Sequence, residues 1–400
     1  MVALGTLVTL VVAALASLFM AWAIGAGSSG STPFAPAVGA NAISVMRAGF
    51  VVGIFGFAGA FLQGANVTEA VGNELVLGNV LTASAATVAL LTAAALVALG
   101  VFAGYPIATA FTVTGAVVGV GLANGGLPAW AKYQQIVSLW VLTPFVGGGA
   151  AYATARLLRK ESVSERVAVP ALGGIVGGIV ATIDFAVFGT EGQPAGSLAE
   201  FVARALPRID VAGVSLGVAL VTVAFALLSA GLVGREMVRD EAQGQRRFLL
   251  VLGGLVAFSA GGSQVGLAIG PLVPLLDTVA IPLPALLVGG GLGLLVGSWT
   301  GAPRMIKALA QDYSSLGPRR SIAAMIPSFA IAQIAVALGV PVSFNEIIVS
   351  AIVGSGYAAG GAGVSREKMV KTVLAWVGSL ALAFGLSYGI FRLVRLVVSV

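Results

Sequence analysis

Long apolar runs follow one another along almost the whole chain, and they limit what it can fold into. Of the 400 residues, 58% are hydrophobic and 9% are charged, whereas a soluble domain is typically about 25% charged. A helix needs about 20 apolar residues to cross a bilayer, where every backbone polar group must be satisfied internally. We therefore expect an all-α polytopic protein that spans the cell membrane with about twelve transmembrane helices. The predicted spans are residues 2–26, 46–64, 81–105, 106–125, 131–155, 170–189, 211–233, 247–262, 282–301, 321–338, 341–360 and 372–391.

Two of these runs are interrupted in the same way by small and hydroxyl-bearing residues that lead to a proline. The first interruption, 23–36, reads AIGAGSSGSTPFAP, and the second, 259–271, reads SAGGSQVGLAIGP. Backbone that leaves helical geometry at membrane depth must be buried in protein or line a water-filled cavity. Matching interruptions in two halves of a chain point to the binding site of a transporter. We therefore expect two re-entrant broken-helix segments, at 28–44 and 263–280.

The interruptions belong to a longer internal repeat. Residues 104–109 (GYPIAT) resemble residues 339–344 (GVPVSF), and the span around Trp140 is matched by the span around Trp376. Because the correspondences occur in the same order, we expect a duplicated architecture. The predicted parts are a first inverted repeat at 1–160, connecting transmembrane helices and a linker at 161–246, and a second inverted repeat at 247–400. Within the connecting part we expect a polar loop at 190–210 and a charged linker at 234–247.

The charges of the loops predict that the two repeats are inverted. The loop at about 65–80 carries Glu69 and Glu74 without any Lys or Arg, whereas its counterpart at about 302–320 is basic. Since cytoplasmic loops carry an excess of Lys and Arg, these equivalent loops are expected on opposite sides of the membrane. Both termini are then expected outside. The basic residues assigned to the inside are Arg156, Arg159, Lys160, Arg235, Arg239, Arg246, Arg247, Arg304, Lys307, Arg319, Arg320, Arg366, Lys368 and Lys371.

The interruptions and the two proline segments carry candidates for anion binding. A helix N-terminus presents free N–H groups at the positive end of the helix dipole, and hydroxyl groups add further donors. We expect four polar helix starts to converge near the midplane and to hold a small oxyanion without a buried Lys or Arg. Small residues also serve helix packing in membranes, which remains the alternative for each stretch. The predicted substrate-binding residues are Ser28, Ser29, Ser31, Thr32, Thr109, Ser263, Gln264, Ser343 and Asn345.

Glu346 stands out because it follows the second proline segment inside an otherwise apolar run. Charged side chains within a span are costly and are functional candidates by default. Glu346 could therefore carry a coupling proton or help to bind a cation. The alternative is a structural carboxyl group that neighbouring helix ends satisfy.

The sequence also excludes several classes of function. It contains neither Cys nor His, which removes disulfides, thiol nucleophiles, histidine bases and the usual zinc sites. We therefore expect no enzyme, no metal site and no cofactor. It has no phosphate-binding loop for ATP, so transport would be secondary or driven by a partner. The net charge of +6 comes from residues between apolar spans and does not indicate nucleic-acid binding.

At these residues the chain resembles the inorganic phosphate transporter (PiT) family over nearly its whole length. That family carries a Gly-Ala-Asn-Asp-Val-Ala-Asn signature once in each half, and residues 25–31 and 261–267 stand in the two places. Its Pro-Val-Ser-Thr-Thr-His segment is similar to residues 106–111 and 341–346. The resemblance implies a twelve-span carrier with inverted repeats. It implies uptake of phosphate or a similar tetrahedral oxyanion together with a cation, often by a homodimer.

The signatures differ from the family at positions that bear on coupling. In the family, the signature Asp and Asn residues help to bind the coupling sodium ions and the anion. Here the two Asp positions are Ser28 and Gln264, and the two His positions are Phe111 and Glu346. Proton coupling through Glu346, a different anion and uncoupled passage are therefore alternatives to sodium coupling.

The leading hypothesis is a secondary transporter of an inorganic oxyanion, phosphate first, which works by alternating access with the anion bound at the broken helices. The coupling cation, a proton or sodium, stays open. The alternatives are a permease for sulfate or another oxyanion, an uncoupled anion channel on the same scaffold, and a membrane subunit or sensor that does not transport.

Overall fold

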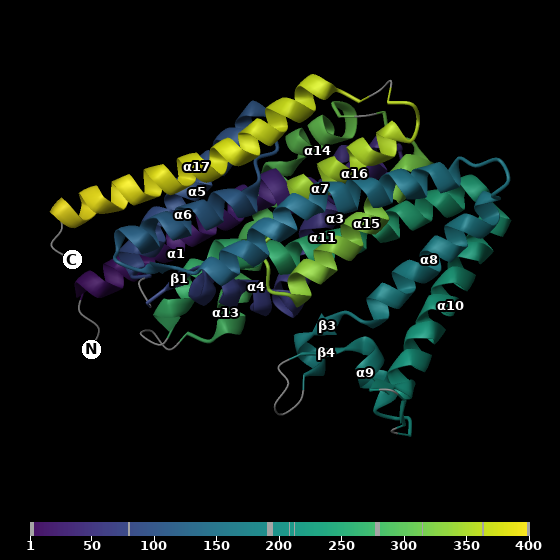
Figure 1. Cartoon of the computed structure of the whole chain (residues 1–400), viewed down its shortest axis with the longest axis horizontal. Coiled ribbons are helices and arrows are strands. Elements are labelled where there is room, and N and C mark those ends of the chain that lie inside the picture. Colours follow the sequence, from purple (N-terminus) through teal and green to yellow (C-terminus); the bar gives the residue numbers. More distant parts are fainter. Residues whose placement is uncertain are drawn as a thin grey trace.

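The computed structural model of the chain is built almost entirely from helices that lie along one another in an elongated bundle (Figure 1). It describes residues 4–78, 81–189, 195–207, 209–211, 213–276, 281–313, 315–361 and 364–397. The longer helices are α1 (Leu4–Ile24), α3 (Val45–Gln63), α5 (Ala83–Ala103), α6 (Thr109–Ala123), α7 (Trp130–Leu158), α8 (Glu165–Ala181), α10 (Leu216–Arg239), α11 (Glu241–Ile269), α13 (Leu283–Thr300), α15 (Pro318–Ala337), α16 (Phe344–Tyr357) and α17 (Arg366–Val397).

Short elements connect the longer helices. The short helical segments are η1 (Gly25–Ser29), α2 (Ala35–Gly39), α4 (Ala65–Glu69), η2 (Ala70–Glu74), η3 (Ala186–Phe188), α9 (Leu198–Ala203), η4 (Gly270–Leu275) and α14 (Ala302–Gln311). The strands among the described residues form three antiparallel pairs, namely β1 (Val76–Leu77) with β2 (Leu127–Pro128), β3 (Asp184–Phe185) with β4 (Gly196–Ser197), and β5 (Asp210–Val211) with β6 (Val214–Ser215).

Nine of the described helices are long and apolar enough to cross a membrane. They are α1 with η1, α3, α5, α7, α10, α11 with η4, α13, α15 and α17. The prediction of an α-helical multi-pass membrane protein is therefore confirmed. A helix lies in each of the twelve predicted ranges. However, α6, α8 and α16 are shorter than the about 20 residues of a full span, so the number of twelve crossings stays a prediction.

The second predicted interruption, at 259–271, does not break the helix, because α11 continues through it to Ile269. Its glycines serve helix packing instead. A Cβ atom at Gly261 would lie 1.8 Å from the backbone oxygen of Gly56 on α3, so the two helices touch backbone to backbone there. The prediction that a broken segment begins at 263 is therefore wrong for this half.

The first interruption does break the helix. There α1 passes into the π-helical turn η1, and a non-helical turn at 30–34 then leads to the five-residue helix α2. The predicted re-entrant segment at 28–44 is thus irregular backbone around one short helix. Residues 277–280, at the end of the second predicted segment, lie outside the described residues.

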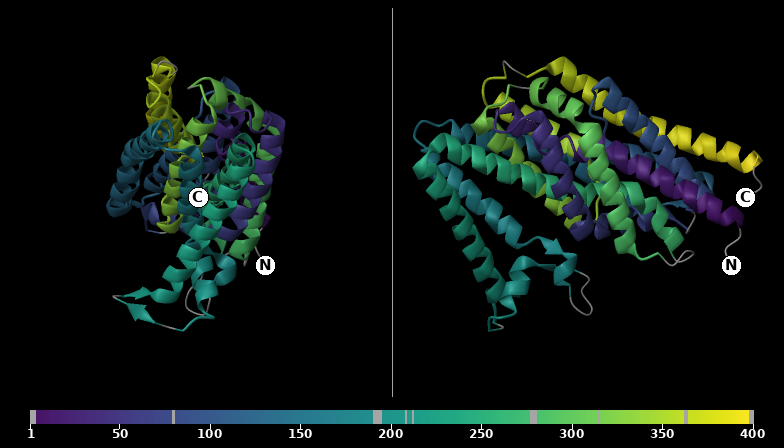
Figure 2. Two further views of the ribbon diagram at one scale, coloured as in Figure 1. Left: turned by 90° about the vertical axis from the view of Figure 1, so that its right-hand side faces the viewer. Right: turned by 180° about the vertical axis from the view of Figure 1, so that it is seen from behind.

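The connecting part of the chain forms an arm that leaves the main bundle (Figures 1 and 2). In this arm α8 and α10 run side by side, and Ala181, Ala199 and Val221 form a small apolar cluster of their own. The predicted span at 170–189 ends early, because α8 stops and β3 and η3 follow. The predicted loop at 190–210 is partly ordered, because its described part contains β4 and α9.

The predicted linker at 234–247 is helical apart from one residue. The first of its two helices, α10, ends at Arg239, and α11 begins at Glu241, with Asp240 in extended conformation between them. The Asp240 carboxylate accepts a hydrogen bond of 3.0 Å from the backbone N–H of Gln243 and so caps α11. A charged run therefore marks a helix boundary here and not a flexible joint.

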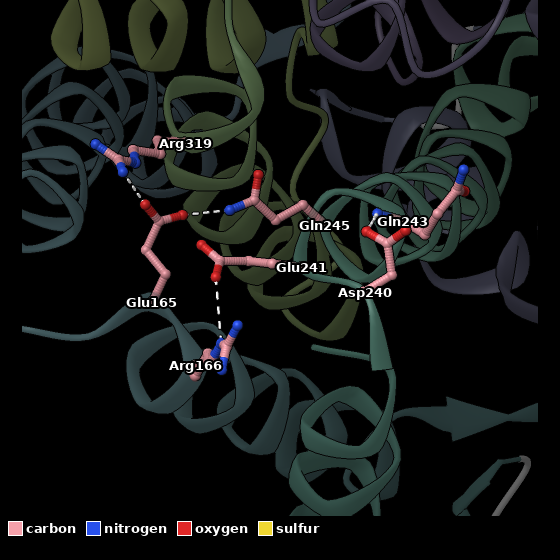
Figure 3. Close-up of polar contacts among 7 residues, drawn as sticks. All are labelled: Glu165, Arg166, Asp240, Glu241, Gln243, Gln245 and Arg319. Carbon is pink, nitrogen blue, oxygen red and sulfur yellow. Dashed lines mark hydrogen bonds and ion pairs between the residues drawn. The ribbon is translucent and has the colours of Figure 1, made fainter. Parts of the chain in front are cut away.

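Charged side chains at the start of α8 connect the arm to the main bundle (Figure 3). Arg166 on α8 lies 3.3 Å from the carboxylate of Glu241 on α11. The buried carboxylate of Glu165 accepts one hydrogen bond from Gln245 on α11 and forms an ion pair with Arg319 on α15. These contacts join the first turn of α8 to two helices of the main bundle.

Candidate functional site

All of the predicted site residues lie inside the bundle, and none of them is more than 2% exposed. They come from four segments of the chain. The segments are η1 and the turn after it, with Ser28, Ser29, Ser31 and Thr32; the first residue of α6, Thr109; the middle of α11, with Ser263 and Gln264; and the start of α16, with Ser343, Asn345 and Glu346. They are almost completely shielded from solvent in this conformation, so the cluster is closed.

Gln264 joins three of these segments. Its side-chain oxygen accepts a hydrogen bond of 2.7 Å from the Thr109 hydroxyl, and its Nε2 donates one of 2.6 Å to the backbone oxygen of Val342. The Thr109 hydroxyl also lies 3.4 Å from the Ser28 hydroxyl. Residues that stand in the two signature positions of the repeats, Ser28 and Gln264, therefore meet through Thr109.

Asn345 completes the connection between the two halves. Its Nδ2 donates hydrogen bonds of 3.0 Å to the backbone oxygen of Gly27 and of 2.6 Å to that of Ile107. Both acceptors belong to the first half of the chain, whereas Asn345 belongs to the second. The backbone oxygens that accept these hydrogen bonds could not be predicted from the sequence, because every residue carries a carbonyl group and only the fold determines which of them face the cluster.

Two of the predicted hydroxyl groups bind the protein's own backbone. The hydroxyls of Ser31 and Thr32 donate to the backbone oxygen of Ser28, at 3.2 and 3.0 Å. These bonds satisfy a carbonyl at the end of η1 and stabilise the turn. The donor capacity of Ser31 and Thr32 is thus already in use in this conformation.

Several other polar atoms of the cluster have no partner. Within the described part of the chain, six buried side-chain oxygens make no hydrogen bond, and five of them belong to predicted site residues. These five are the hydroxyls of Ser29, Ser263 and Ser343, Oδ1 of Asn345 and Oε2 of Glu346. A buried polar atom without a partner costs about 1–3 kcal/mol. These five atoms belong to segments that the hydrogen bonds of Gln264 and Asn345 join, so the unsatisfied groups are concentrated in the part of the bundle where those segments meet.

The charges of the cluster are sparse. Glu346 is 1% exposed and forms no ion pair within the described residues. In the same residues no group of three or more His, Cys, Asp or Glu side chains could hold a metal ion. Donors for an anion would therefore be neutral hydroxyl and amide groups, as the sequence predicts.

Two tryptophans hold the turns that lead into the cluster, a role that the sequence analysis missed. The Trp140 indole on α7 donates to the backbone oxygen of Pro341 at 2.9 Å, and the Trp376 indole on α17 donates to that of Pro106 at 2.8 Å. Each long helix therefore supports the proline turn of the other half of the chain. The matching positions of the two tryptophans in the repeat were the available signal.

Comparison with known proteins agrees with this architecture. The model of the Phosphate transporter family matches residues 24–387 of the chain. A protein of Thermococcus kodakarensis named as a phosphate permease is 25% identical, over 94% of this chain and 96% of its own. A similarly named protein of Pyrococcus abyssi is 27% identical, over 95% and 96%. The chloroplastic inorganic phosphate transporter 2-1 of Arabidopsis thaliana is 25% identical, over 90% of this chain and 68% of its own.

A solved structure has the same fold. It is described as the sodium-dependent phosphate transporter, and it matches with a TM-score of 0.82 and 22% sequence identity. The match covers 98% of this chain and all of the other. Because the family model also matches nearly the whole length, we conclude that the chain belongs to the phosphate transporter family.

Proposed function

We propose that the chain is a secondary transporter of inorganic phosphate in the cell membrane, which works by alternating access. The observation that carries this proposal is the set of three buried hydroxyl groups without partners, those of Ser29, Ser263 and Ser343. They come from three segments that hydrogen bonds hold together, and they offer donors to a small oxyanion without a fixed positive charge. The predicted residues beside them shape the same cluster.

Unpartnered acceptors favour phosphate over sulfate. Hydrogen phosphate and dihydrogen phosphate carry at least one O–H group, whereas sulfate carries none at neutral pH. Oδ1 of Asn345 and Oε2 of Glu346 are buried oxygens that lack a donor, and the O–H of phosphate could supply one. A site that leaves buried acceptors unpaired with the wrong ligand discriminates strongly against it.

The closed state of the cluster favours a carrier over an open channel. Every predicted site residue is at most 2% exposed, so an anion could enter or leave only after the helices move. A carrier that exposes its site alternately to each side passes through such a closed state.

Equivalent contacts support two inverted repeats. A Cβ at Gly119 on α6 would lie 2.6 Å from the backbone oxygen of Phe384 on α17, and one at Gly354 on α16 would lie 2.0 Å from that of Gly148 on α7. These glycines occupy matching places in the sequence repeat, and so do their contacts. The helices α7 and α17 begin at opposite ends of the bundle (Figure 1), as inverted repeats require.

We further propose that Glu346 couples transport to a cation, and that the proton fits this site best. Glu346 is a single buried carboxylate without a basic partner among the described residues, so one proton would neutralise it. The two signature positions, Ser28 and Gln264, carry no charge that would attract sodium.

Uptake into proteoliposomes tests the proposal. We expect saturable phosphate uptake that an inward proton gradient accelerates and that sulfate inhibits weakly. Ser28→Ala and Gln264→Ala should lower the rate of uptake or the affinity for phosphate. Ser355→Ala is the matched control, because the buried Ser355 hydroxyl bonds to Ile352 of its own helix. Unchanged transport and affinity in both site variants would refute the site. Flux that never saturates would favour the channel, and acceleration by sodium alone would refute proton coupling.

A further inference from the structure

Two ion pairs occupy equivalent places in the two halves of the chain. In the first half, Lys132 lies 2.7 Å from the carboxylate of Glu74; in the second, Lys368 lies 3.0 Å from that of Asp312. Lys132 is in the first turn of α7 and Lys368 in the first turn of α17. Glu74 ends η2, and Asp312 directly follows α14, so both acids end the short helical segment after the second helix of their half.

The two ion pairs lie toward opposite ends of the bundle. The start of α7 follows β2, which pairs with β1 at the end of the bundle where α1 begins and α17 ends (Figure 1). The helix α17 runs toward that same end, so its start lies at the other end, beside α14 (Figure 1). The two pairs therefore lie at different faces of the protein.

Each lysine also contacts the turn that leads into the buried cluster from the opposite half. Lys132 Nζ donates a hydrogen bond of 3.3 Å to the backbone oxygen of Gly339, which lies two residues before Pro341. Lys368 Nζ lies 4.7 Å from the ring centroid of Tyr105, the residue before Pro106, a distance typical of cation–π attraction.

The second contact is reinforced by a neighbouring tyrosine. Lys368 Nζ also lies 5.9 Å from the ring of Tyr313, whose hydroxyl is 2.8 Å from that of Thr372. Burial raises the pKa of Tyr313, so its phenol stays protonated and keeps this hydrogen bond. Lys368 therefore lies close to two aromatic rings, and Thr372 on its own helix holds one of them.

We propose that Lys132 and Lys368 are positioning residues that close the transport path, one at each end, by holding the proline turn of the opposite half. Lys132 and Trp140, both on α7, contact the proline turn of the second half. Lys368 and Trp376, both on α17, contact the proline turn of the first half. In this conformation both lysines are engaged and the cluster is closed. Release of Lys132 frees the turn before Ser343, and release of Lys368 frees the turn before Thr109, so the two faces open separately.

This inference rests on the proposed alternating access, and its test uses accessibility so that the two can fail separately. The chain contains no cysteine, so one engineered thiol reports alone. Ala108→Cys places it at the fully buried N-cap of α6, between Pro106 and Thr109. Membrane vesicles of both orientations are labelled with a thiol reagent that cannot cross the membrane, and phosphate uptake is measured in parallel.

Lys132→Met and Lys368→Met are compared in this background, with Lys371→Met as the matched control. Lys371 is an exposed lysine on α17, paired with Glu367 one turn away. We expect Lys132→Met to raise labelling several-fold from the face that carries Glu74, Lys368→Met to raise it from the other face, and Lys371→Met to change neither. Increased labelling from both faces in each variant would indicate a general loosening of the structure and would overturn the inference.

A charge exchange separates the role of the ion pair from the role of the hydrogen bond to the turn. The double variant Glu74→Lys with Lys132→Glu rebuilds the ion pair in reverse, but a carboxylate cannot donate to the backbone oxygen of Gly339, so labelling is expected to stay raised from that face. Restored low labelling would show that the ion pair alone keeps the path closed and would overturn the assigned hold on the turn. Increases from the same face in both single variants, or no increase in either, would overturn the inference. If the parent protein takes up no phosphate, the proposed function fails, whereas the labelling pattern still decides the role of the lysines.

Discussion

Substitutions of two serines one turn apart on α11 should separate an effect on ligand binding from an effect on the stability of the fold. The Ser263 hydroxyl has no partner, whereas the Ser259 hydroxyl donates to the backbone oxygen of Leu255 at 2.9 Å and accepts from Gln333 at 2.6 Å. Ser263→Ala should leave the ligand-free free energy of unfolding unchanged or raise it by about 1 kcal/mol, since an unsatisfied group is removed. A hydrogen bond to a charged ligand contributes about 1.5–3 kcal/mol, so the Kd for phosphate should rise about 10- to 150-fold.

Ser259→Ala is the matched control and should behave in the opposite way. It removes the shorter of two acceptors of the Gln333 amide and leaves only Gln63 Oε1, at 3.3 Å. This change should lower the free energy of unfolding by about 1–3 kcal/mol, and it should leave the Kd for phosphate unchanged. Both quantities are measured on purified protein in detergent, by unfolding without ligand and by binding of radiolabelled phosphate. If Ser263→Ala destabilises the ligand-free protein and binds phosphate normally, its hydroxyl serves packing, and our reading of the unpartnered oxygens is refuted.

Three further outcomes follow from the structure. Glu346→Gln keeps the shape of the side chain and removes its ionisation, so phosphate uptake should become insensitive to a proton gradient; uptake that still follows the gradient would contradict the assignment. Trp140→Phe and Trp376→Phe each remove one indole donor to a proline turn, and unfolding measurements should show similar losses of about 1 kcal/mol in the two variants; a loss in one alone would argue against equivalent roles. Gly261→Ala should lower the free energy of unfolding by about 1–3 kcal/mol through overpacking and should reduce the yield of monodisperse protein. Gly289→Ala, with open space around its Cβ, should be tolerated; equal yields of the two variants would refute the close helix contact.

The sequence predicted the class of fold and the grouping of the site residues for simple physical reasons. Apolar runs of bilayer length have few alternatives to membrane-spanning helices. Polar residues within such runs are costly at the lipid surface, so Ser28, Gln264 and Asn345 were expected inside the bundle and near one another. Their burial confirms that placement, while anion binding and the homodimer that the resemblance implies remain predictions.

What the sequence could not supply depends on contacts between distant segments. Glycines in a membrane helix mark either a break or a close approach, and Gly261 serves the latter because Gly56 of another helix lies against it. A charged run is equally compatible with a loop and with helix ends, and the capping bond of Asp240 selects the helix ends. The partners of Trp140 and Trp376 are backbone oxygens, which carry no mark in the sequence.

The exchange of support between the two halves has a consequence for biosynthesis. The turn at Pro106 receives its indole donor from Trp376, which lies 270 residues further along the chain. At a synthesis rate of about 5–20 residues per second, the first half would wait roughly 15–55 s in the membrane before that donor is made. During this time its polar turn has to be shielded by lipid headgroups, water or the insertion machinery. Chains truncated before Trp376 should therefore be removed by quality-control proteases as readily as chains that lack the whole second half.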